Sequence, residues 1–412
     1  MPSTSELARW RWAVTGAFGF GGVAGSALGP RLPTIKADLN ISTGTIGLLL
    51  AGMTVGAIGG LLASTPIRHW LGGRRGIAGA VLVVTGSLAV MGVALILGWI
   101  PLLAAALVVS GTGIGLLDVL INVEGSAVER TAGHSLMPGM HAAWSIGAAV
   151  GSGIGAACAA LGVTPAAQLI GEAAVLAAAG LVTASGVPAG EHAPADPVAD
   201  APRRDRAAAF RQWLRGWANV QLLLIGVVML GCELGEGSAN SWLTLAVKNN
   251  HAQTAAIAAL FFTAFAISEG ATRIFAGPVV DRLGRVRTTR ITTAAGLIGV
   301  VLFILGGNLW LVLLGVVLWG VGVSMGFPLG MSAAAESGPN PAAQLSVVAS
   351  IGYFAGLAGP PIVGALAESA GLLNALWLIA ILFLAAFAAA GTLRPRAPVA
   401  QANEDHISSP GR

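Results

Sequence analysis

Apolar residues follow one another along the chain in long continuous stretches, each as long as the roughly 20 residues that a helix needs to cross a bilayer. They do not alternate with a period of two, which argues against membrane-spanning strands. The stretches predict twelve transmembrane helices at residues 12–30, 43–65, 77–98, 101–123, 138–161, 166–187, 218–246, 254–279, 290–307, 309–333, 343–367 and 372–393. The expected fold is an all-α polytopic membrane protein with two six-helix bundles.

The composition supports this class. Of the 412 residues, 55% are apolar and only 10% are charged, whereas a soluble domain has about 25% charged residues. Mean hydropathy is +0.80, so a soluble, disordered or coiled-coil protein is excluded. The two cysteines, Cys158 and Cys232, lie inside apolar stretches and predict no disulfide framework. The first apolar stretch is interpreted as a retained span rather than a cleaved signal peptide.

The basic residues fall mostly on one side of the predicted helices. Of 22 Lys and Arg residues, 18 lie in the segments that share a side with the N-terminus. Because short cytoplasmic loops carry an excess of Lys and Arg, we expect both termini in the cytoplasm. The basic residues are dispersed among short loops, so the pI near 9.8 predicts no nucleic-acid binding.

A polar segment divides the chain into two similar parts. Residues 188–216 are rich in Pro, Ala and charge, which predicts a cytoplasmic linker between bundles at 1–187 and 217–393, with a cytoplasmic tail at 394–412. The segment 65–75 aligns with 277–287 at an offset of 212 residues, and three glycine patterns align at offsets of 205 to 210. Two such repeats place a solute site at the midplane between the bundles.

The second copy of this segment carries a recognisable motif. Gly277-Pro-Val-Val-Asp281-Arg282-Leu-Gly284-Arg285 resembles the loop motif G-x-x-x-D-R-x-G-R of the major facilitator superfamily. The copy in the first half is degraded, with His69 in the place of the Asp and Gly73 in the place of an Arg. The resemblance implies twelve helices in two bundles and secondary transport by alternating access.

Further segments resemble a bacterial branch of this superfamily that includes YbjJ-like inner-membrane proteins and is distantly similar to fucose permease. They are 118–125, 128–130, 141–147, 236–242 and 352–361. The resemblance implies a bacterial plasma membrane protein. The fourth span lacks the Arg of many proton-coupled drug antiporters, and the fifth lacks their Gly-Pro pair, which weakens a drug-efflux interpretation.

Acidic residues inside a span are costly and are candidates for function. Glu233 and Glu236 lie in the middle of the seventh span, and Asn240 is four residues further along the same face. These carboxylates could hold a proton, bind a polar or cationic substrate, or only form hydrogen bonds between helices. Glu236 is expected to be the main functional carboxylate and Glu233 to support it. His141 and Trp144 in the fifth span are further candidates for proton or substrate binding.

A second set of charged residues is expected to act in gating. Glu269 and Arg273 are four residues apart in the eighth span and are expected to form an ion pair. Asp118 is expected to gate, and could cap the fifth span or pair with Arg130. The other gating candidates are Asn122, Asp281, Arg282, Arg285, His69 and Arg75.

No nucleotide-binding loop, metal cluster or hydrolase motif is recognisable, so the chain is not expected to be an enzyme or to need a cofactor or metal. The expected function is secondary transport of a small solute, coupled to a proton or another ion, by a monomer in the lipid bilayer. A drug or metabolite exporter of the same fold is an alternative. A sensor or assembly factor that does not transport is another, although retained midplane acids argue against it.

Overall fold

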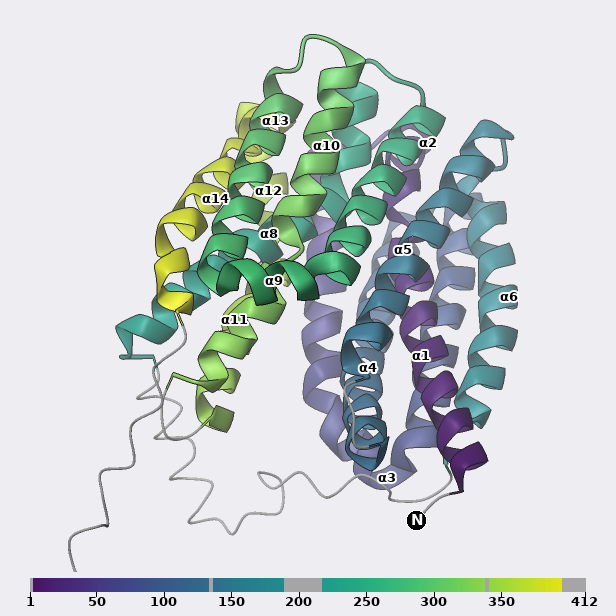
Figure 1. Ribbon diagram of the computed structural model, residues 1–412. Coiled ribbons are helices and arrows are strands. Elements are labelled where there is room, and N and C mark those ends of the chain that lie inside the picture. Colours follow the sequence, from purple (N-terminus) through teal and green to yellow (C-terminus); the bar gives the residue numbers. More distant parts are fainter. Residues whose placement is uncertain (1–2, 133–135, 189–216, 338–340, 395–412) are drawn as a thin grey trace, which may run out of the picture.

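The computed structural model consists of helices in two groups that stand side by side (Figure 1). It describes residues 3–132, 136–188, 217–337 and 341–394. The N-terminal half contains α1 (Thr4–Ser26), the short η1 (Gly29–Arg31), α2 (Leu32–Asp38), α3 (Thr43–Leu97), α4 (Ile100–Ala132), α5 (Met137–Ala160) and α6 (Pro165–Ser185). The C-terminal half contains α8 (Val220–Asn249), α9 (Ala255–Leu305), α10 (Leu309–Val323), α11 (Gly326–Ala335), α12 (Pro341–Ala370), α13 (Leu372–Ala375), α14 (Trp377–Ala389) and η2 (Ala390–Leu393).

Helix lengths agree with twelve membrane crossings. Among the described residues, eight helical segments are long and apolar enough to cross a membrane, and the bent α12 is a ninth. Two of the eight, α3 with 55 residues and α9 with 51, are twice as long as one crossing requires. Counting these two helices twice and adding α12 and the 23-residue α1 gives the twelve crossings that the sequence predicts.

The two long helices differ from the sequence prediction, which placed loops between their crossings. In each of them two helices follow one another directly and the backbone breaks between them at one glycine. Gly72 has φ 72° and ψ 175°, and Gly284 has φ 77° and ψ 162°. This conformation is essentially restricted to glycine. The two glycines are 212 residues apart, the offset that the sequence repeat predicts.

Glycines allow close packing of helices within a half. A Cβ at Gly56 of α3 would lie 2.0 Å from the carbonyl oxygen of Val108 in α4, and a Cβ at Gly111 of α4 would lie 1.9 Å from that of Met53 in α3. The two backbones therefore touch where neither helix carries a side chain, as is common for helices in lipid.

The two halves contact each other most closely at one end, the upper end in Figure 1. There Thr244 of α8 donates to the carbonyl oxygen of Gly29 at 2.7 Å, and Lys248 donates to that of Pro33 at 3.3 Å. Glu368 of α12 accepts from the backbone N–H of Gly44 at 2.6 Å. At the lower end, where the N-terminus lies, α4 and α11 stand apart in Figure 1. These three hydrogen bonds therefore join the two halves at the upper end.

The predicted linker and tail can be followed only at their edges. Pro188 and Arg394 are described, whereas residues 189–216 of the linker and 395–412 of the tail lie outside the described residues. Their cytoplasmic location, and the proposed division of the chain at these segments, stay predictions.

Candidate functional site

The guanidinium of Arg273 on α9 is the centre of a charged cluster between the two halves. Its Nη2 donates to Oε2 of Glu236 on α8 at 2.9 Å. Its Nη1 forms an ion pair with Glu269, one turn earlier on α9. The pair with Glu269 is the one that the i, i+4 spacing predicts. The contact with Glu236 joins two helices and makes the pair a triad.

Arg273 makes two further contacts that hold it in place. Its Nε donates to the backbone carbonyl of Ser324 at 3.3 Å. Ser324 lies at the break between α10 and α11, where a carbonyl is not used by the helix. Its Nη1 lies 3.4 Å from Oγ of Ser145 on α5, in the other half of the molecule. The charged triad therefore reaches across the interface between the halves.

Helices α5 and α9 form this interface along much of their length. A Cβ at Gly270 of α9 would lie 3.0 Å from Cβ of Ser145, so only a very small residue fits at this position. Further toward the upper end, the hydroxyls of Ser152 on α5 and Thr263 on α9 are 3.1 Å apart. A change of charge at Arg273 or Glu269 would act directly on this contact surface.

Glu233 lies one turn before Glu236 on α8 and differs from it in its partners. Its Oε1 is buried and has no hydrogen-bond partner among the described residues. Leaving a buried acceptor unpaired costs free energy, and an ionised carboxylate in such a place costs more. Glu233 therefore lacks at Oε1 the kind of partner that Glu236 has in Arg273.

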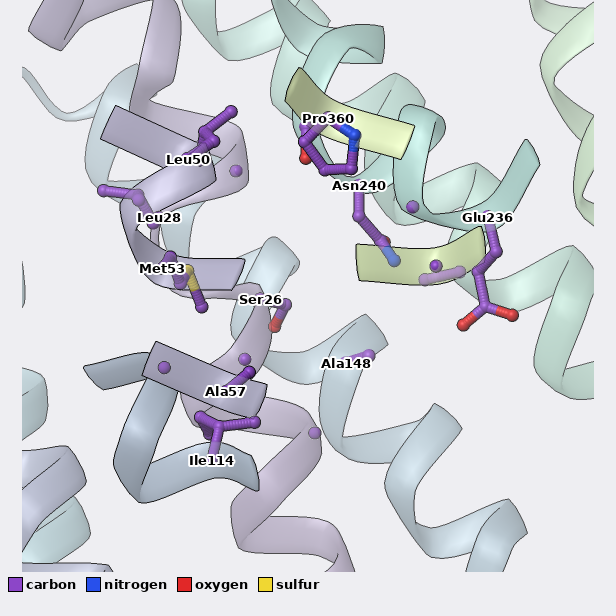
Figure 2. A pocket seen from close by; sticks show the side chains of 18 of the residues that line it. Ser26, Leu28, Leu50, Met53, Ala57, Ile114, Ala148, Glu236, Asn240 and Pro360 are labelled. Atoms are coloured by element: carbon purple, nitrogen blue, oxygen red, sulfur yellow. The ribbon is translucent and has the colours of Figure 1, made fainter. Parts of the chain in front are cut away.

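A cavity of about 280 Å³ opens beside the triad and is lined by both halves. Glu236 and Asn240 of α8 and Glu269 of α9 contribute polar groups on one side. Figure 2 shows apolar side chains of the N-terminal half on the other side, including Leu50, Met53, Ala57 and Ile114. The C-terminal half thus supplies the acidic groups of the cavity, and the N-terminal half supplies apolar side chains together with the hydroxyl groups of Ser26, Thr54 and Ser145.

The structure places the other predicted binding residues around this cavity. Trp144 lines it, in contact with the glycines of α1, where a Cβ at Gly21 would lie 2.2 Å from the indole ring. His141 is one turn from Ser145 on α5 but is not part of the lining. Its ring packs edge-on against Phe18 with 5.0 Å between centroids. Its predicted role in proton binding stays a prediction.

Asp118 makes a different contact from those that the sequence suggested. Its carboxylate accepts from the side-chain amide of Asn122 at 3.1 Å and hydrogen bonds with the hydroxyl of Tyr353 on α12. The start of α5 is capped instead by Glu129, which accepts from the N–H groups of Leu136 at 2.6 Å and Met137 at 2.8 Å. The Asp118–Tyr353 contact again joins the two halves.

The residues of the loop motif lie at the lower end and do not join the cavity. Asp281, Arg282, His69 and Arg75 are exposed there. Arg285 forms two hydrogen bonds to Glu336 at the end of α11, at 2.7 and 2.5 Å. These hydrogen bonds hold the pKa of Glu336 below its ordinary value of 4.5. The gating role of these residues stays a prediction, and the observed pair lies within one half.

Several residues of this site were missed from the sequence. Ser145, Ser324 and Glu336 carry no pattern that marks them, since each acts through a partner distant in the chain. Tyr353 could have been singled out, because it is the only tyrosine of the chain. A lone phenolic hydroxyl in an apolar helix usually finds a hydrogen-bond partner.

Known proteins resemble the chain over most of its length. The family model described as Major Facilitator Superfamily matches residues 229–410. The uncharacterized transporter y4wD of Sinorhizobium fredii is 30% identical over 370 residues, which cover 88% of this chain and 92% of the relative. An uncharacterized MFS-type transporter of Yersinia pestis is 27% identical over 376 residues, 91% of this chain and 93% of the relative.

Solved structures of transporters share the fold. The nucleoside transporter NupG superposes with a TM-score of 0.71 at 16% identity, over 94% of this chain and all of that chain. The fucose:proton symporter FucP of E. coli superposes with a TM-score of 0.63 at 15% identity, over 93% of this chain and 98% of that chain. At these identities the likeness establishes the twelve-helix fold alone.

Proposed function

The chain belongs to the major facilitator superfamily of solute transporters, and on this basis we propose that it is a proton-coupled secondary transporter of a small solute. The observation that carries the proposal is the convergence of three carboxyl groups, Glu233, Glu236 and Glu269, on the single cation Arg273 beside a cavity shared by both halves. One guanidinium cannot neutralise three carboxylates. The free-energy cost of placing the cluster in a membrane is therefore lowest when the cluster also holds a proton.

Within this proposal the carboxyl groups have separate tasks. Glu236 is partly exposed, at 23% of its side chain, and lines the cavity where a solute would contact it. The unpartnered oxygen of Glu233 makes it the better supported proton carrier. The residue pattern alone favoured Glu236 for the proton, whereas the contacts favour Glu233 and leave Glu236 for the solute.

The same cluster provides a route from protonation to movement of the halves. Arg273 contacts Glu236 and Glu269 in its own half and Ser145 in the other. Losing or gaining a proton changes how strongly the carboxylates hold Arg273, and thereby its contact with α5. Rocking of one bundle against the other would then expose the cavity alternately at the two ends.

The orientation follows from the distribution of basic residues. The lower end carries most of the Lys and Arg residues, so we assign it to the cytoplasm of a bacterial inner membrane. The upper-end contacts through Thr244, Lys248 and Glu368 then close the outer side.

The test uses purified protein in liposomes that contain a pH-sensitive dye. Sugars, amino acids, nucleosides and cationic drugs are added in turn, and the proposal expects at least one class to cause proton movement. Glu233→Gln should abolish this movement while solute-for-solute exchange survives, because exchange does not require return of an unloaded, deprotonated carrier. Asp38→Asn, at an exposed acid of α2, is the control that should behave as wild type. Solute uptake that is independent of pH in the wild type would contradict proton coupling.

An exporter of the same fold remains the second candidate, because the apolar half of the cavity suits a partly apolar solute. The same liposomes separate the two directions. When protons flow inward, a symporting importer carries solute inward with them. An exporter that exchanges solute for protons carries solute outward instead.

A further inference from the structure

We infer that the transported solute is a small organic cation, with one protonated amine on an apolar body. The inference rests on the proposed transport function and adds to it the chemical class of the solute. It follows from the charges that face the cavity, from the way Arg273 is occupied, and from the contrast between the two walls of the cavity.

The charged side chains that line the cavity are both acidic. They are Glu236, with 23% of its side chain exposed, and Glu269, with 9%. Oε2 of Glu236 is bound to Arg273. The described residues provide no hydrogen bond to Oε1, and Figure 2 shows the carboxyl group extending from α8 into the space between the helices. A solute in the cavity therefore meets a carboxylate oxygen that has room for a donor.

Arg273 is largely occupied by contacts with the protein. A guanidinium has five N–H donors, and four contacts of this one are with Glu236, Glu269, Ser145 and the carbonyl of Ser324. It stands behind the two carboxylates and does not line the cavity. An anion would face two like charges in a medium of low dielectric constant, where repulsion is strong. The site therefore selects against anions.

An ammonium group finds suitable partners on both sides of the cavity. Glu236 offers a carboxylate oxygen, and Asn240 lines the cavity one turn further along the same face of α8. Trp144 lines the opposite wall from α5, and its ring is held against Gly21 of α1. A cation near an indole ring is attracted by its π electrons. An amine bound here would bridge the two halves.

The side chains of the N-terminal half indicate the chemistry of the solute apart from its ammonium group. Leu28, Leu50, Met53, Ala57 and Ile114 of the N-terminal half face the cavity (Figure 2). A hydroxyl group placed against these side chains would have no partner, which costs free energy. The hydroxyls of Ser26, Thr54 and Ser145 in the same lining could serve only a few polar groups of a solute. The volume of about 280 Å³ is at the lower end of the range for ligand pockets. A compact apolar body attached to one ammonium group fits both features.

The experiment compares three probes of similar size that share a phenyl ring and end in a cationic, a neutral or an anionic group. Phenethylamine, phenethyl alcohol and phenylacetate are added to the purified protein at pH 7, and the melting temperature is measured. A ligand that binds the folded state raises it. We expect phenethylamine to raise the melting temperature and the other two to leave it unchanged. Glu236→Gln should weaken the apparent affinity for phenethylamine about tenfold or more, and Asp38→Asn should retain it.

The outcomes separate the solute class from the transport function. If phenethyl alcohol stabilises the protein as well as phenethylamine does, or if phenethylamine has no effect, the cationic class is wrong. Proton movement driven by sugars or nucleosides in the liposome assay would then still support the transport function. Conversely, binding of phenethylamine that depends on Glu236 but drives no proton movement would uphold the class and contradict proton coupling. If Glu236→Gln does not fold, the comparison of the three probes on the wild type decides.

Discussion

The two halves of the molecule use the same backbone turn at their lower ends but surround it with different chemistry. Gly72 and Gly284 have nearly equal backbone angles at equivalent positions of α3 and α9. The next residue is Gly73 in the first half and Arg285 in the second. The turn is therefore set by the glycine, and the charge of the loop motif is not needed to form it.

In each half an acidic side chain lies next to the residue that follows the turn glycine. One of these acids is exposed and the other is buried. In the second half Glu336 is exposed, at 46% of its side chain, and binds Arg285. In the first half Glu124 is buried, at 6%, and accepts from the indole N–H of Trp10 at 3.1 Å. A Cβ at position 73 would lie 2.1 Å from Oε1 of Glu124, so an arginine does not fit there without rearrangement. The buried carboxylate of Glu124 thus occupies the space beside Gly73 that a larger side chain would need.

The midplane shows the same asymmetry. The C-terminal half supplies Glu233, Glu236, Glu269 and Arg273, whereas the N-terminal half supplies the apolar wall of the cavity and the hydroxyl of Ser145. Duplicated bundles can therefore divide their tasks, with one half performing the ion chemistry and the other shaping the space for the solute. Variants in the two halves should separate these tasks.

The largest effect is expected from Arg273→Gln, which removes the partner of two carboxylates at once. Breaking a buried ion pair by removing one member costs about 3–5 kcal/mol, so we expect loss of transport and a large drop in thermal stability of the purified protein. The double variant with Glu269→Gln should be more stable than Arg273→Gln alone, since it leaves one carboxylate fewer unpaired. Arg282→Gln, at an exposed arginine of the same helix, is the matched control for the stability measurement. A double variant no better folded than either single one would refute the pairing.

The next effect concerns the buried acid of the first half. Trp10→Phe removes the indole donor to Glu124 while keeping an aromatic ring. Loss of a hydrogen bond to a buried charged group costs about 1–3 kcal/mol. We expect a clear decrease in melting temperature, larger than that caused by Glu336→Gln in the second half. Equal effects of the two variants would mean that burial does not distinguish the two acids.

The two turns should respond alike to alanine. At Gly72 and at Gly284 a Cβ meets no atom within 4 Å, so any cost of alanine comes from the backbone conformation. Holding an L-residue in this glycine-only backbone region costs about 1–3 kcal/mol. Gly72→Ala and Gly284→Ala should therefore lower stability by similar amounts. Gly59→Ala, where a Cβ also meets open space but φ is not positive, should be neutral by the same measurement.

The sequence predicts features that depend on one helix at a time. Twelve crossings follow from hydropathy, and the Glu269–Arg273 pair follows from i, i+4 spacing. The repeat offset of 212 residues predicts the equivalence of Gly72 and Gly284. These features are local, or are repeated at a constant distance, so the pattern of residues contains them.

The contacts that join different helices could not be predicted from the sequence. Glu236 and Arg273 are 37 residues apart, and Arg273 and Ser145 are 128 apart. Their meeting depends on how α5, α8 and α9 rotate about their own axes, which hydropathy does not specify. Our proposal of Glu233 rather than Glu236 as the proton carrier likewise depends on which carboxyl oxygen lacks a hydrogen-bond partner. The glycine breaks inside α3 and α9 were missed because a charged segment between apolar stretches is typical of a loop.

The smallest effect is expected at the exposed pair of the second half, and it depends on pH. Arg285 lowers the pKa of Glu336 below its ordinary value of 4.5, so the folded state favours the ionised form. The pair therefore stabilises the protein above that value, and its contribution is lost as the pH falls through the lowered pKa. Because Glu336 is largely exposed, the pair contributes only about 0.2–1 kcal/mol to the free energy of unfolding near neutral pH. The melting temperature of Glu336→Gln should lie slightly below that of the wild type at pH 7 and approach it as the pH falls below 4.5. High salt at pH 7 should also reduce the difference, since it screens exposed charges. A difference that persists at low pH and high salt would show that Glu336 acts through packing rather than charge, and that the two halves differ less than their acids suggest.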